Sequence, residues 1–71
     1  MGHAEILKQE ATKFVREHRA NMVGRFGSES QAIAGVSKIL EDIVTSHKSS
    51  GASFSGMKDA IVRALAGLVS N

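Results

Sequence analysis

Residues 28–47 read SESQAIAGVSKILEDIVTSH, and this stretch decides the fold. Its apolar side chains recur at steps of three and four residues, which places them on one face of a helix. That face consists of Ala32, Ile33, Val36, Ile39, Leu40, Ile43, Val44 and His47. Ser28 and Gln31 have the spacing of a capping box, in which each side chain accepts a hydrogen bond from the other residue's backbone N–H. The pattern therefore predicts a helix over residues 29–47.

Gly35 lies inside this stretch and allows two interpretations. A glycine within a helix costs about 1 kcal/mol relative to alanine, so it either lets another helix approach closely or marks a break. Residues 30–38 resemble a helix-turn-helix, in which a glycine occupies the turn and the residues after it, here Ser37 and Lys38, read base edges. The apolar face runs through Gly35 without the change of phase that a turn would cause, so we favour a continuous helix.

Two further stretches carry apolar residues at helical spacing, over residues 4–23 and 54–69. A glycine just past a periodic run is the usual C-cap, so Gly24 and Gly27 predict a turn over residues 24–28. Residues 48–53 are rich in serine and glycine and predict a loop. We therefore expect one all-α domain over residues 1–71, an up-down-up bundle of three helices. In the third helix the core positions are predicted to be Phe54, Ile61 and Leu65.

The third predicted helix is apolar around most of its circumference. Val62, Ala66 and Val69 lie well round from its main apolar stripe. Such a helix must be buried on more than one side, and a three-helix bundle covers only one side of each helix. We therefore predict a homodimer formed through Val62, Ala66 and Val69, with Lys58 and Arg63 on the rim. The side of the second helix that carries Gly35 is a further candidate surface.

The chain has only 71 residues and no cysteine, so no disulfide can stabilise it. A core this small supplies only about 3–5 kcal/mol, which also favours association with another chain. The absence of cysteine suits a reducing compartment, and we expect a cytoplasmic protein. No apolar run reaches the length of a transmembrane helix, and the N-terminus lacks the pattern of a signal peptide.

Catalytic, cofactor and metal sites find little support in the sequence. No serine lies in a nucleophile-elbow pattern, and no carboxylate is placed to orient a histidine. His18 falls on the apolar face of the first helix, where a partly buried histidine is more common than a ligand. His47 is expected to lie beside His3, but two histidines make a poor zinc site. We expect a protein that is not an enzyme and that holds neither a cofactor nor a metal.

Three functions stay open. The first is a small interaction, assembly or regulatory module that binds protein, with a second copy as the expected partner, through the apolar face of the third helix. The second is a DNA- or RNA-binding regulator that combines the helix-turn-helix-like segment with basic side chains as phosphate contacts. Those side chains are Lys8, Arg16, Arg19, Arg25 and Lys38. The third is a membrane-active protein, because residues 56–69 resemble a cationic amphipathic peptide and small cysteine-free helical bacteriocins.

Overall fold

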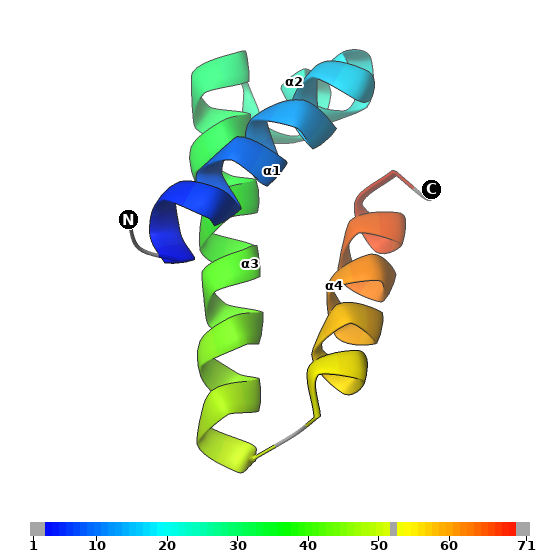
Figure 1. Cartoon of the computed structure of the whole chain (residues 1–71). Coiled ribbons are helices and arrows are strands. Elements are labelled where there is room, and N and C mark those ends of the chain that lie inside the picture. The colour runs from blue at the N-terminus through cyan, green and yellow to red at the C-terminus, as the bar shows by residue number, and fades with distance from the viewer. Residues whose placement is uncertain (1–2, 52, 70–71) are drawn as a thin grey trace.

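The computed structural model describes residues 3–51 and 53–69, with side chains from residue 5 onwards, and every element in these ranges is a helix (Figure 1). The helices are α1 (His3–Glu17), α2 (Arg19–Phe26), α3 (Glu29–Ser50) and α4 (Phe54–Val69). The long α3 contacts each of the other three. α4 returns antiparallel to α3, and its C-terminal end comes back toward α2 (Figure 1). The all-α class predicted from the sequence is confirmed.

The first predicted helix is divided in two at His18. This residue has φ −123° and ψ 42°, outside the helical region. Backbone hydrogen bonds nevertheless cross the break, from the His18 N–H to the Phe14 carbonyl (3.0 Å) and from the Met22 N–H to the His18 carbonyl (2.9 Å). The break is therefore a bend and not a loop. The bend gives α1 and α2 different directions, and both helices contact α3.

The connection between α2 and α3 is shorter than predicted. α2 continues through Gly24 to Phe26, and Gly27 is the C-cap, with φ 104° and its N–H donating to the Val23 carbonyl (2.8 Å). Only Gly27 and Ser28 lie outside the helices. The Ser28 hydroxyl accepts a hydrogen bond from the Gln31 N–H (3.2 Å), which confirms Ser28 as the N-cap of α3.

α3 runs through Gly35 without a break, so residues 30–38 contain no turn. The ring of Phe26, at the end of α2, lies directly against Gly35. A Cβ at this position would lie 2.8 Å from Phe26 Cδ1 and would overlap Cε1. Gly35 therefore allows the close approach of α2, which confirms the first of its two interpretations. The close approach that Gly35 permits is therefore made within the chain, and association through this side of α3 stays a prediction.

The connection between α3 and α4 is also tighter than the predicted loop of residues 48–53. α3 extends to Ser50 and ends at Gly51, which has the left-handed φ of 74° that favours glycine. The Ser53 hydroxyl then accepts a hydrogen bond from the Gly56 N–H (3.1 Å) and caps α4. The two helices consequently run antiparallel to each other (Figure 1).

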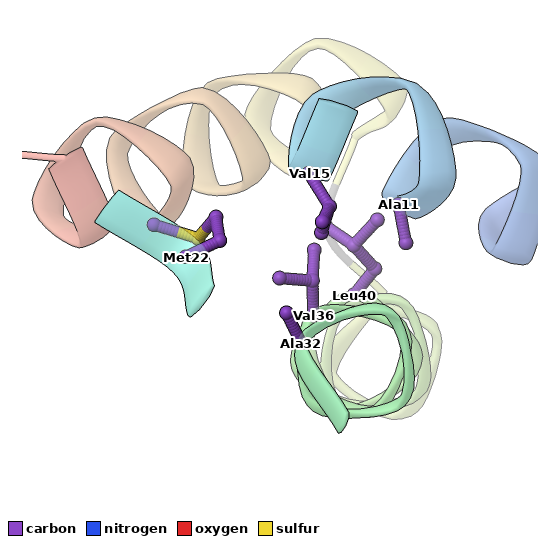
Figure 2. Close-up of a cluster of buried hydrophobic side chains, with 6 residues drawn as sticks. All are labelled: Ala11, Val15, Met22, Ala32, Val36 and Leu40. Carbon is purple, nitrogen blue, oxygen red and sulfur yellow. The ribbon is translucent and has the colours of Figure 1, made fainter. Parts of the chain in front are cut away.

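The buried core lies where α1 and α2 cross α3, and α4 contributes no residue to it. Its members are Ala11, Val15, Met22, Ala32, Val36 and Leu40. Figure 2 shows Ala11 and Val15 of α1 directed toward Val36 and Leu40 of α3. Ile61 and Leu65 of α4 are half-buried and pack against the edge of this cluster. Phe54 is 70% exposed, so its predicted place in the core is wrong: it begins α4 at the end of the molecule that α1 and α2 do not cover.

Candidate protein-interaction surface

α4 is the helix with the largest mismatch between composition and burial. Ten of its sixteen residues are apolar, yet none of the sixteen is buried. Only one side of the helix packs on α3 and α2, and the opposite side has no neighbour among the described residues. Three large apolar side chains are exposed in the described chain, and two of them, Phe54 and Val62, belong to α4. Val62 is 63% exposed. α4 therefore presents apolar surface that the fold itself does not use.

The residues predicted to form the interface fall into two groups. Val62 and Ala66 are exposed, whereas Val69 is half-buried and packs against the core. Arg63 and Lys58 are exposed. The Arg63 guanidinium lies 3.7 Å from the Asp59 carboxylate, and the Lys58 ammonium lies 5.6 Å from the centre of the Phe54 ring. The cation over the ring keeps part of that exposed aromatic face covered.

A groove lies between α1 and α4, with α3 as its floor. It consists of two adjoining hollows of about 350 Å³ and about 470 Å³, which share Leu7 and Ile61 in their walls. We call this the α1–α4 groove. Its apolar lining consists of Leu7, Phe14, Leu40, Val44, Phe54, Met57, Ile61 and Leu65. The sequence did not reveal the groove, because it depends on how α1 and α4 are spaced across α3.

The rim of the α1–α4 groove carries charges of opposite sign on its two sides. On the α1 side Glu10, Lys13 and Glu17 line it, with a net charge of −1. On the other side Lys48 of α3 and Lys58 of α4 line it. An apolar floor between charged rims is the arrangement by which grooves bind amphipathic helices, because it matches one apolar and two polar faces.

Two of the five basic side chains proposed for nucleic-acid binding lie close to carboxylates. The Arg19 Nε lies 3.4 Å from a Glu29 carboxylate oxygen, and the Lys38 ammonium lies 3.6 Å from Asp42. Lys8 borders a hollow that Glu29 also lines. Arg16 and Arg25 complete the set of five. Carboxylates at this distance oppose the approach of phosphate, so this surface favours nucleic acid less than a continuous basic stripe would.

The histidines make local contacts. His18 is half-buried with its ring 4.8 Å from that of Phe14, and His47 Nδ1 lies 2.9 Å from the Ile43 carbonyl oxygen of its own helix. The side chain of His3, expected beside His47, lies outside the described residues. Within the described part of the chain, no three histidine or carboxylate side chains are grouped as metal ligands.

None of the helices described here combines the length and apolar character that crossing a bilayer requires. Comparisons with protein-family models, with curated proteins and with solved structures find no match. The functional inference therefore depends on the chemistry of α4 and of the α1–α4 groove.

Proposed function

We propose that this protein is a non-enzymatic interaction module that associates through the exposed apolar surface of α4, and that its partner is a second copy of the chain. The observation that supports this proposal is a helix with ten apolar residues and no buried one. Contiguous apolar surface on a small protein marks an interaction site, because leaving it in water is unfavourable by about 25 cal/mol per Å².

The chain as a whole exposes more surface than a compact monomer of its mass. The chain exposes 4811 Å² of surface. Its mass is 7.5 kDa, and a compact monomer of that mass exposes about 4,250 Å². The excess is about 560 Å² per chain on this scale. Two copies that each hid this excess would bury about 1,100 Å² together, just above the roughly 1,000 Å² that a specific interface needs.

Association would also supply the stability that the core lacks. The six residues of the core cluster include three alanine or methionine side chains and only one leucine, and a core of this size contributes little net stability. Burial of Val62 and Ala66 between two chains would add apolar contact without a disulfide or a metal. A cytoplasmic location suits such a chain, since it has no cysteine to oxidise.

Measurement of the solution mass over a range of concentrations, in low and in high salt, tests the proposal. A dimer that persists in high salt is expected, because apolar burial is not screened by ions. Val62→Glu should give a folded monomer, whereas Thr45→Glu, which adds the same charge at an exposed site of α3, should leave the dimer intact. A chain that is monomeric throughout, or a Val62→Glu variant of unchanged mass, would contradict the proposal.

Binding assays on the same samples test the other two functions. A nucleic-acid regulator would shift an oligonucleotide in low salt only, and Arg16→Glu combined with Arg19→Glu would abolish that shift. A membrane-active protein would bind anionic vesicles through residues 56–69 as a monomer. Either result, together with a monomeric chain, would replace the interaction module as the preferred function.

A further inference from the structure

The α1–α4 groove is an apolar hollow that shares α4 with the exposed surface described above. We propose that the groove of each copy receives α4 of the other copy, with Lys58 and Arg63 of the incoming helix meeting Glu10 and Glu17 on the rim. The inference rests on the self-association proposed above and adds its geometry. A simple face-to-face contact of two α4 helices would not require α1 at all.

The apolar surface is continuous from the groove to the exposed face of α4. Ile61 and Leu65 form one row along α4 and line the groove. Lys58, Val62 and Ala66 are also spaced by four residues and form the next row around the helix. Lys58 lines the groove as well, so the second row begins at the groove, and Val62 and Ala66 continue it along the exposed side of α4. A helix seated in the groove therefore contacts both rows of α4.

The arrangement closes on itself in a two-fold dimer. α4 is at once a wall of its own groove and the helix that enters the other groove, so the same contacts occur twice. The small side chains of Val62 and Ala66 allow two helix axes to approach at about 8–10 Å. Across the groove, Leu7 and Phe14 of α1 then cover the side of the incoming α4 that would otherwise face water.

The two rims of the groove differ in charge, which sets the orientation of an incoming α4: its basic residues are attracted to the acidic α1 rim and repelled by Lys48 and Lys58 on the opposite rim. The three charged residues of α4, Lys58, Asp59 and Arg63, give the helix a net charge of +1. The α1 rim has a net charge of −1 and includes Glu10 and Glu17, two helical turns apart on the side of α1 that lines the groove. Exposed ion pairs add little affinity, but unlike charges fix which surfaces meet and in which orientation.

An exchange of charges between two variants tests this docking mode. One variant combines Glu10→Lys with Glu17→Lys, and the other combines Lys58→Glu with Arg63→Glu. When either variant is studied alone, the rim of each groove and the incoming α4 carry charges of the same sign. We therefore expect self-association to weaken by about tenfold at low salt. Mixed in equal amounts, the two variants meet opposite charges in both grooves. A heterodimer should therefore form, detected by native mass spectrometry and light scattering.

A matched control distinguishes an effect of charges in the groove from an effect of the total charge of the protein. Glu5→Lys with Glu41→Lys changes the total charge by the same amount as the first variant, at exposed sites that do not line the groove. This control should self-associate like the parent and should not pair preferentially with the Lys58→Glu, Arg63→Glu variant. Equal pairing with the control would overturn the inference. Circular dichroism of each variant verifies that the exposed substitutions leave the fold intact.

The outcomes also distinguish the inference from the proposed function. If Val62→Glu gives a monomer but both charge variants dimerise as strongly as the parent, the α4 face associates in another geometry and the groove inference fails alone. If the parent chain is monomeric at every concentration, both fail. Preferential formation of the charge-exchanged heterodimer supports both.

Discussion

Replacement of Gly35 by alanine should destabilise the protein, against the usual preference of helices for alanine. Gly35 lies in the interior of α3, where alanine would ordinarily be favoured by about 1 kcal/mol. In this fold a Cβ would lie 2.8 Å from Phe26 Cδ1 and 3.1 Å from Cζ, and it would overlap Cε1. The ring cannot keep its position, so the end of α2 must shift away from α3 or the ring must leave the contact.

The magnitude follows from two opposing contributions. Overpacking of a well-filled contact costs about 1–3 kcal/mol, and the helical preference of alanine returns about 1 kcal/mol. We expect a net loss of about 1 kcal/mol in the free energy of unfolding. Gly24, in α2, has no atom within 4 Å of an added Cβ, so Gly24→Ala should gain about 1 kcal/mol. For a domain of this size the two variants should melt about 8–16 °C apart.

Thermal unfolding followed by far-ultraviolet circular dichroism is the suitable assay, because the chain has no tryptophan or tyrosine to report by fluorescence. All variants are compared at one protein concentration, since association raises the apparent stability. Phe26→Ala removes the clash, so in that background Gly35→Ala should become stabilising. A Gly35→Ala variant that melts above the parent, with Phe26 intact, would refute the close packing of α2 on α3.

Substitutions at four further positions probe other parts of the fold. Gly27→Ala should lower stability by about 1–2 kcal/mol, because φ is 104° at this C-cap, and unchanged urea midpoints would contradict that. Ser28→Ala removes the N-cap of α3 and should cost about 1 kcal/mol, while Ser28→Asp should retain most of it in the same titration. Leu40→Ala should cost about 2–5 kcal/mol and leave little cooperative melting. Val62→Glu should abolish the dependence of the melting temperature on protein concentration, and persistence of that dependence would exclude α4 as the interface.

Features that depend on a few neighbouring residues could be predicted from the sequence. The cap at Ser28 and the continuity of the helix through Gly35 both follow from spacing within one or two turns. The exposure of Val62 and Ala66 also follows from helical geometry, since both lie away from the main apolar stripe of α4. That this surface binds another chain stays a prediction, which the solution mass of the protein tests.

Features that depend on contacts between distant helices could not be predicted. The bend at His18 has no proline or glycine to signal it, and it arises where α1 and α2 both pack on α3. Phe54 fits the apolar stripe of α4, but that stripe extends beyond the part of α3 that the other helices cover. Val69 lies off the stripe and still contacts the core, because the C-terminal end of α4 approaches α2. The α1–α4 groove follows from the same arrangement.

The placement of the entire buried core in α1, α2 and α3 gives the molecule an uneven resistance to opening. α4 can leave α3 without uncovering a fully buried side chain of its own, so its amide hydrogens should exchange with solvent through a partial opening. Amides in the middle of α3 should exchange only when the whole chain unfolds. Any partner that covers α4 would therefore reveal itself first as slower exchange in that helix, before the rest of the molecule changes at all.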